Sequence, residues 1–208
     1  AVVYDNTGNA DFPLAPVQGA FIEQGLAAKS TLKREGDTLM WIGRNEAGGA
    51  RCFRAQGFVP KPVSTPAVEQ AWQKYGDVSD AVAFVDQRNG HPEYRVTFPG
   101  GDTSWCFDLQ TEMWHERASL DGEPGLLHAQ IQRFHCFCAG VHYVLGTDGI
   151  IYREDQAQAR MDGAHQRQFM RVAPVISVEN KQMFFSRMEV DIEPGAGTDG
   201  DPTVESAD

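Results

Sequence analysis

Long apolar runs are missing from this sequence. The longest ones, over 81–85, 141–145 and 150–152, have the length of a β-strand or are interrupted by a polar residue, whereas a helix needs roughly 18 apolar residues to cross a bilayer. We therefore expect no membrane anchor. No basic segment followed by an apolar one opens the chain, so we expect that a secretory signal is absent or has been removed. The chain begins at Ala1, inside a strand-like segment over 1–5, and we expect it to be a piece of a longer protein.

Positive charge is also scarce. The 18 Lys and Arg residues are outnumbered by 29 Asp and Glu residues, which gives a formal net charge of −11. Lys and Arg supply most of the affinity of proteins for a phosphate backbone, and here they are scattered apart from the pair Lys33 and Arg34. General nucleic-acid binding is therefore disfavoured. An acidic surface instead lets DNA pass close by without adhering.

Cysteine is limited to four residues: Cys52, Cys106, Cys136 and Cys138. Each lies in an apolar or aromatic run, which predicts buried thiols and a reducing compartment. Cys136 and Cys138 would point to the same face of a strand, where a disulfide between them is strained. His135 and His142 do not supply the usual spacing of a zinc site. The sequence therefore predicts no metal site and no cofactor.

Helical patterns are equally rare, and one segment stands out, over residues 65–75. Thr65 is a suitable N-cap, Pro66 occupies the first helical position and Gly76 follows the end, which are the usual start and stop signals of a helix. One face of this helix gathers the apolar residues at helical spacing, namely Val68, Ala71, Trp72 and Tyr75.

Short strands joined by tight turns make up most of the chain. The first unit is a hairpin with strands over 38–43 and 50–54 and a turn over 44–49. The second unit is a meander of strands over 80–86, 93–98, 103–108 and 113–117. The third unit has strands over 133–138, 141–145 and 150–153. Alternating apolar positions bounded by Gly, Asn, Asp and Pro turns predict antiparallel pairing in all of them.

The spacing of these units predicts a β-propeller. The chain advances 43 residues from Asp37 to Asp80 and 53 from Phe84 to Phe137, close to the roughly 40 to 50 residues of a four-stranded blade. A blade packs against a neighbour on each face, so we expect large apolar residues at many positions of its inner strands. The fold class is therefore all-β, a propeller-like array of four-stranded antiparallel blades with about three blades in this chain and one short helix.

The end of the chain differs in composition. Residues 191–208 are rich in Gly, Pro and acidic residues and lack an apolar pattern. We therefore divide the chain into a propeller-like region over 1–190, part of a larger protein, and an acidic loop or tail over 191–208.

One strand carries residues typical of acid–base chemistry. Trp114, His115, Glu116 and Arg117 place an imidazole beside a carboxylate and a guanidinium. On a strand, however, His115 and Arg117 share one face while Trp114 and Glu116 share the other. We interpret the segment as a strand end held by hydrogen bonds and an Arg–carboxylate pair, and Trp105 and Trp114 as packing between blades. Neither an HExxH nor a G-x-S-x-G motif occurs, so no catalytic residue is predicted.

Two other functions stay open. A propeller glycosidase or sialidase acting on host-surface sugars needs two carboxylates about 5 to 10 Å apart, one with a raised pKa. The available carboxylates are Asp80, Asp86, Asp108 and Glu116, but the sialidase-type box of Ser, Asp, Gly and Trp is missing. A lectin-like binding module is harder to distinguish, because turns alone can build its pocket.

Segments spread from about residue 19 to about residue 202 carry a resemblance to a known family: 19–25, 41–49, 89–91, 94–99, 103–108, 113–117, 188–195 and 200–202. They resemble the packaged-DNA stabilisation proteins of short-tailed phages, also called tail hub or nozzle proteins. From these segments and the reasoning above we take as structural signature residues Trp41, Trp105, Asp108, Trp114, His115, Glu116 and Arg117.

The resemblance implies a non-enzymatic structural protein of the virion tail, assembled in the host cytoplasm. Copies of it would form a hexameric ring of β-propellers below the portal and adaptor, in contact with tail-tip proteins. The ring would help close the channel and retain packaged DNA, which passes through without specific binding. The net charge of −11 adds the hypothesis that acidic residues face this channel. A basic channel wall with the acids outside would contradict it.

Overall fold

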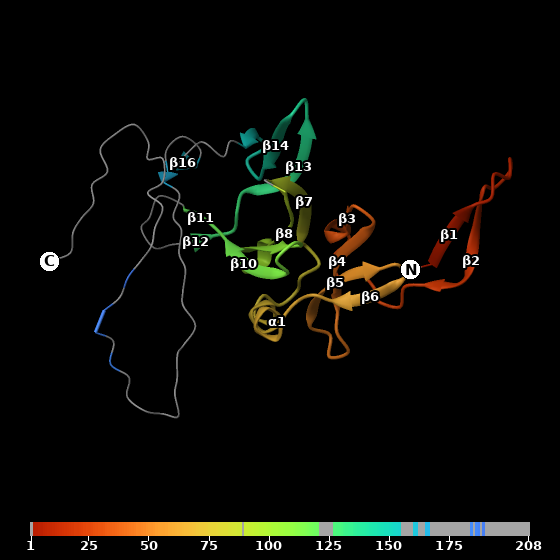
Figure 1. Cartoon of the computed structure of the whole chain (residues 1–208), viewed down its shortest axis with the longest axis horizontal. Coiled ribbons are helices and arrows are strands. Elements are labelled where there is room, and N and C mark those ends of the chain that lie inside the picture. The colour runs from red at the N-terminus through yellow and green to blue at the C-terminus, as the bar shows by residue number, and fades with distance from the viewer. Residues whose placement is uncertain are drawn as a thin grey trace. The chain divides into compact units, whose positions relative to one another are not determined.

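The computed structural model describes residues 2–88, 90–120, 127–154, 160–161, 165–166, 184, 186–187 and 189. The chain forms two compact units, Ala1–Glu154 and Asp155–Asp208. In the second unit, the described strands β16 (Arg160–Met161) and β17 (His165–Gln166) pair antiparallel. The tail expected over 191–208 lies outside the described residues. Figure 1 traces the elements along the chain.

The first sheet is a four-stranded antiparallel meander in the order β3, β4, β5, β6. Its strands are β3 (Lys33–Glu35), β4 (Thr38–Arg44), β5 (Ala50–Gln56) and β6 (Val59–Pro62). The hairpin predicted over 38–54 is confirmed as β4 and β5, and the structure adds a short strand on either side of it.

Two prolines close one edge of this sheet. Pro60 and Pro62 of β6 pair with Ala55 and Phe53 of β5, while the next residue, Val63, donates its N–H to a carbonyl of β5 at 2.9 Å. Because alternate residues of a strand direct their N–H groups to opposite sides, the nitrogens of Pro60 and Pro62 face away from β5. The outer edge of β6 therefore lacks two donors that a further strand would need.

The second sheet is the four-stranded meander that the turns predict. Its strands are β7 (Val82–Arg88), β8 (His91–Phe98), β9 (Thr103–Asp108) and β10 (Met113–Arg117), and they lie in this order. The 3-10 turn η2 (Pro99–Gly101) joins β8 to β9. The predicted strand positions agree with the observed ones to within one or two residues.

The third sheet has three strands among the described residues: β13 (Gln132–Cys138), β14 (Val141–Gly146) and β15 (Ile151–Glu154). The expectation of buried thiols is correct for Cys52 and Cys106 and wrong for Cys136 and Cys138, which are exposed. Both lie on the face of β13 that is turned away from the second sheet, as do Phe134 and, across the sheet, Ile151, which are 52% and 68% exposed. These four exposed residues show that an apolar or aromatic run in the sequence is not enough to predict burial.

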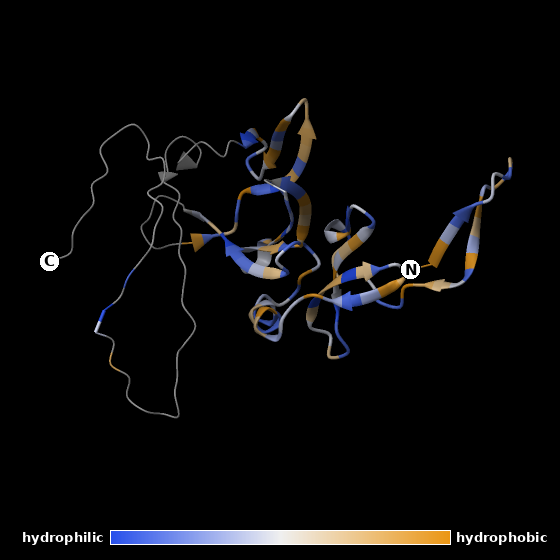
Figure 2. Cartoon of the chain, viewed as in Figure 1, coloured by the Kyte–Doolittle hydropathy of each residue, from blue (hydrophilic) through white to orange (hydrophobic). Residues whose placement is uncertain are grey.

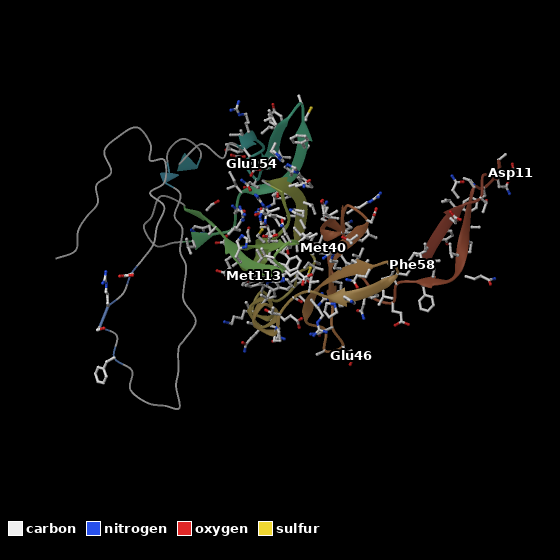
Figure 3. The ribbon with its side chains drawn as sticks, viewed as in Figure 1. Asp11, Met40, Glu46, Phe58, Met113 and Glu154 are labelled. Atoms are coloured by element: carbon white, nitrogen blue, oxygen red, sulfur yellow. The ribbon has the colours of Figure 1, made fainter. Side chains whose placement is uncertain are left out.

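Two smaller hairpins complete the first unit. Strand β1 (Val2–Asn6) pairs with β2 (Leu14–Phe21), and β11 (Ser119–Leu120) pairs with β12 (Leu127–His128). Asp11, labelled in Figure 3, lies in the loop that joins β1 to β2. The described residues include no helix with the length and hydrophobicity needed to span a bilayer.

The predicted helix forms as α1 (Pro66–Gln73). The Thr65 hydroxyl accepts the N–H of Val68 at 3.4 Å, which caps the first turn. Gly76 follows with a φ of +71°, a left-handed backbone that glycine adopts without a Cβ clash. Arg51 of β5 donates to both carboxylate oxygens of Glu69, at 2.9 and 3.0 Å. This bidentate pair ties the helix to the first sheet.

The main core lies between the first sheet, α1 and one face of the second sheet. Its fully buried members include Met40, Ile42, Trp72, Tyr94, Val96 and Phe98. Figure 3 shows Met40 among closely packed side chains. At Gly43 of β4, a Cβ would lie 2.7 Å from the Gly25 carbonyl oxygen and 2.9 Å from the Phe53 ring. Only glycine fits this close approach of two backbone segments.

Candidate functional site: the two faces of the second sheet

The second sheet separates its side chains by polarity. One face joins the main core through Tyr94, Val96, Phe98, Trp105, Phe107 and Trp114. The cross-strand register places on the opposite face Asp86, Glu93, Arg95, Thr97, Ser104, Cys106, His115 and Arg117. Figure 2 shows hydrophobic and hydrophilic residues mixed along these strands. The inner strands β8 and β9 carry large apolar residues as expected, but these lie on the core face, whereas ion pairs and hydrogen bonds fill much of the second face.

Trp72 of α1 is the centre of an aromatic cluster. Its ring centroid lies 5.1 Å from that of Phe98, 6.3 Å from that of Trp105 and 5.2 Å from that of Trp114, and the two Trp pairs meet edge to face. Edge-to-face contacts are favourable for aromatic rings beyond their buried area. The cluster therefore holds α1 against β8, β9 and β10.

Two of the three indole N–H groups in this cluster donate a hydrogen bond to an acceptor among the described residues. Trp105 donates to the Tyr75 hydroxyl at 3.1 Å, and Trp114 donates to the Val63 carbonyl at 2.9 Å. The indole N–H of Trp72 is buried and has no acceptor among the described residues. Trp105 and Trp114 thus connect the second sheet to α1 and to the segment after β6.

Trp41 lies apart from this cluster. Its ring stacks on that of Phe53 at a centroid distance of 5.8 Å, and the two form a small core with Ala55. Ile22 and Leu39 pack against it. Trp41 therefore covers the face of the first sheet that is turned away from the main core.

Arg95 is the centre of this second face of the sheet, which we call the charged face. The side chain is 4% exposed and pairs with Asp86 at 3.0 Å and with Glu93 at 2.8 Å. It also reaches Glu154 of β15 at 3.5 Å, and its guanidinium lies 5.5 Å from the centroid of the Phe84 ring. One guanidinium therefore binds carboxylates from both the second and the third sheet, and it does so away from solvent, where the loss of one partner is costly.

The polar residues of β10 join the same network. Arg117 donates to Glu93 at 2.6 Å and to the Nε2 atom of His115 at 3.2 Å. Partial desolvation and the nearby Arg117 guanidinium lower the pKa of His115. The carboxylate partner of Arg117 is thus Glu93 on β8, while the neighbouring Glu116 is exposed.

Asp108 ends β9 as a hydrogen-bond acceptor. Its Oδ2 atom lies 2.8 Å from the Nδ1 atom of His91, and its Oδ1 atom accepts the backbone N–H groups of Gln110 and Thr111. Burial alone would raise the pKa of the Asp108 carboxyl, but these hydrogen bonds outweigh it and lower the pKa to about 2. Asp108 therefore stabilises the turn between β9 and β10.

The chain between β12 and β13 is attached to β9. The N–H of Ala129 donates to Asp102 at 2.9 Å, and the N–H of Gln130 donates to the Ser104 hydroxyl at 2.9 Å. His128 also lies 2.6 Å from the Asp102 carboxylate. These bonds fix where the third sheet starts relative to the second.

Two histidines of the third sheet meet the charged face. The Nε2 atom of His135 on β13 lies 2.8 Å from the Nδ1 atom of His142 on β14, and the His135 ring stacks on Phe84 of β7 at 5.8 Å. The usual sequence spacing of metal ligands does not reveal that the two histidines lie together with Asp86, because Asp86 belongs to another sheet. In the sequence, the dipeptide Asn-Gly at 89–90 is a hairpin-turn signal that predicts Asp86 opposite Glu93. The observed register agrees and places Asp86 on the face that holds Arg95.

Successive four-stranded antiparallel meanders that pack against one another through buried side chains have the arrangement of neighbouring blades in a β-propeller. Residues 2–144 match the family model described as "Bacteriophage P22 Gp10, beta-propeller". The chain therefore belongs to this family of phage DNA stabilisation proteins. A comparison with curated proteins found no match. The match spans the first two sheets and reaches into β14, whereas the resembling segments over 188–195 and 200–202 lie beyond it.

Proposed function

We propose that this chain is a non-enzymatic structural component of the phage tail, a hub or nozzle bound below the portal and adaptor. In this role it helps close the channel and retain the packaged DNA. The observation that carries the proposal is the family match, because it runs over residues 2–144 and so includes both four-stranded sheets.

The contacts that three of the signature residues make with other side chains support a structural role. Trp105 and Trp114 pack against α1, and Arg117 pairs with Glu93. Side chains that bind one another in this way rigidify a fold, whereas a catalytic group has to reach a substrate.

Most of the carboxylates that a glycosidase could use already bind other groups of this chain. Asp80 accepts the N–H of Gly100 at 3.1 Å, Asp86 pairs with Arg95 and Asp108 has the pKa lowered to about 2. A general acid of a glycosidase needs a raised pKa instead. Glu116 is exposed. These observations favour the structural role over sugar hydrolysis.

In the proposed assembly, copies of the chain form a hexameric ring that contacts tail-tip proteins. The net charge of −11 would keep DNA from adhering as it passes. Light scattering at several protein concentrations measures the oligomer. A chain that stays monomeric both alone and with portal and adaptor present would contradict the ring.

The proposal is tested by mixing the purified chain with portal–adaptor assemblies and, separately, with host-surface glycans. We expect binding to the assemblies and no release of reducing sugar. Glu116→Gln is the matched control, because it removes the exposed carboxylate and leaves the charged face intact. Sugar release by the wild type that Glu116→Gln abolishes would refute the structural role, as would glycan binding without any binding to portal or adaptor.

A further inference from the structure

Three potential metal ligands from two sheets converge beside the charged face. Asp86 of β7 is buried, and His135 and His142 are half-buried. A carboxylate oxygen of Asp86 and one nitrogen of each imidazole all lie within 4.8 Å of one another. Half-burial leaves the group reachable by a small ion from solvent, while the buried carboxylate supplies a charge.

The two imidazoles are held in place by their neighbours. His142 lies opposite Phe137 in the ladder, and His135 lies opposite Val144, so both histidines occupy the same face of the third sheet. The His142 ring contacts Phe137 at a centroid distance of 4.7 Å, and the His135 ring stacks on Phe84. Ligands fixed in this way lose little conformational freedom when an ion binds.

The donor types select among metals. Two imidazole nitrogens and one carboxylate oxygen suit Zn²⁺ and similar transition metals, whereas Mg²⁺ and Ca²⁺ prefer oxygen ligands throughout. Zinc–nitrogen bonds of about 2.0 to 2.1 Å in a tetrahedron place two nitrogens a little over 3 Å apart. The present separation of 2.8 Å is a hydrogen-bond distance that needs only a small opening. The shared proton would then move to the other nitrogen of its ring.

We propose that Asp86, His135 and His142 form a binding site for a divalent transition metal of the Zn²⁺ type, which links the second sheet to the third. Arg95 pairs with the Oδ2 atom of Asp86 at 3.0 Å, so the carboxylate bridges the guanidinium and the metal. Outer partners of this kind orient a metal ligand. A water molecule completes four-coordination.

A second group of potential ligands on the same face serves as a contrast. Glu93, Cys106 and His115 also lie within 4.8 Å of one another. Glu93, however, pairs with both Arg95 and Arg117, and burial raises the pKa of the Cys106 thiol to about 12. A metal would need the thiolate. The metal site is therefore assigned to the group with the two histidines.

The test uses the 208-residue chain with Cys136→Ser and Cys138→Ser, because exposed thiols are themselves zinc ligands and would compete with the proposed site. The chain is stripped with a chelator and titrated with Zn²⁺ by calorimetry. We expect one Zn²⁺ per chain. At about 100 times the dissociation constant, the thermal midpoint should rise by about 5 to 10 °C, and Mg²⁺ should not shift it.

His142→Gln is the decisive variant and His128→Gln its control, since His128 pairs with Asp102 outside the group. We expect His142→Gln to weaken zinc binding at least about 100-fold, because loss of an outer partner alone costs about 10- to 100-fold. Far-UV circular dichroism checks the fold of each variant. Visible spectra of the Co²⁺ form provide a second readout, with four-coordinate bands in the parent chain and none in His142→Gln.

Three results would overturn the proposal. They are no zinc binding by the folded Cys136→Ser, Cys138→Ser chain, unchanged binding after His142→Gln, and six-coordinate Co²⁺ bands that His142→Gln leaves as they are. None of these depends on a role in the phage tail, so failure of the metal site leaves the proposed function standing.

Discussion

Replacement of Trp72 tests how the aromatic cluster is held together. Its side chain is 0% exposed and contacts the rings of Phe98, Trp105 and Trp114. Removing a buried Trp side chain costs about 3 to 5 kcal/mol. We therefore expect Trp72→Ala to lower the free energy of unfolding by that amount, a large part of the stability of a typical domain.

Trp72→Phe separates packing from hydrogen bonding. It removes the pyrrole half of the ring, which we take to cost about 1 to 2 kcal/mol on the scale of core truncations. It also removes a buried N–H that has no acceptor among the described residues, a group whose burial costs about 1 to 3 kcal/mol. The two effects oppose each other, so the net change should stay within about 1 kcal/mol.

Trp114→Phe is the matched control. Its N–H donates to the Val63 carbonyl at 2.9 Å, so this variant loses a hydrogen bond of about 1 kcal/mol in addition to packing. Urea denaturation followed by far-UV circular dichroism gives the free energy of unfolding of each variant, with the urea slope as the check that the unfolding transition is the same. If Trp72→Phe loses about as much stability as Trp72→Ala, the indole N–H does have a partner and the reasoning is wrong.

The other predictions concern a close backbone contact and two titratable groups. Gly43→Ala should cost about 1 to 3 kcal/mol because its Cβ would clash with backbone, whereas Gly25→Ala, whose Cβ meets nothing within 4 Å, should be neutral in the same urea experiment. Asp108→Asn should be less stable than the wild type at neutral pH. The Asp108 contribution is fully present above the unfolded pKa of about 3.9 and is lost as pH falls through the folded pKa of about 2, so the difference in thermal midpoint should narrow only below about pH 4. His115 has a lowered pKa in the folded chain, so the unfolded chain binds its proton more tightly and stability falls as pH drops below about 6.5. His115→Gln should weaken that fall, and an unchanged pH profile would contradict it.

The strands and the helix could be predicted because local signals decide them. The turn residues around Gly90 and Asp102 bound the strands of the second sheet, and Thr65, Pro66 and Gly76 mark the ends of α1. Each of these signals acts within a few residues of its element, so neighbouring sheets do not alter it.

The environment of each face could not be predicted in the same way. Cys106 and Cys136 both lie in aromatic strands, yet the first is buried and the second exposed, because a neighbouring sheet covers one and not the other. The alternation of Glu93, Tyr94 and Arg95 does not by itself predict a buried charged face, because the polar residues of an alternating strand usually face solvent. What the sequence does not reveal is that Glu154, which belongs to another sheet, supplies a further partner of Arg95.

The prolines of β6 have a consequence for how copies of this chain can meet. Edge-to-edge aggregation requires an edge strand whose backbone N–H groups are free to pair with another chain. Pro60 and Pro62 remove two of these N–H groups from the outer edge of β6. Replacing both with threonine would restore both N–H groups and open a route to stacking without altering any buried contact of the main core. Neighbouring molecules are thereby directed to meet through side-chain surfaces rather than by extending this ladder.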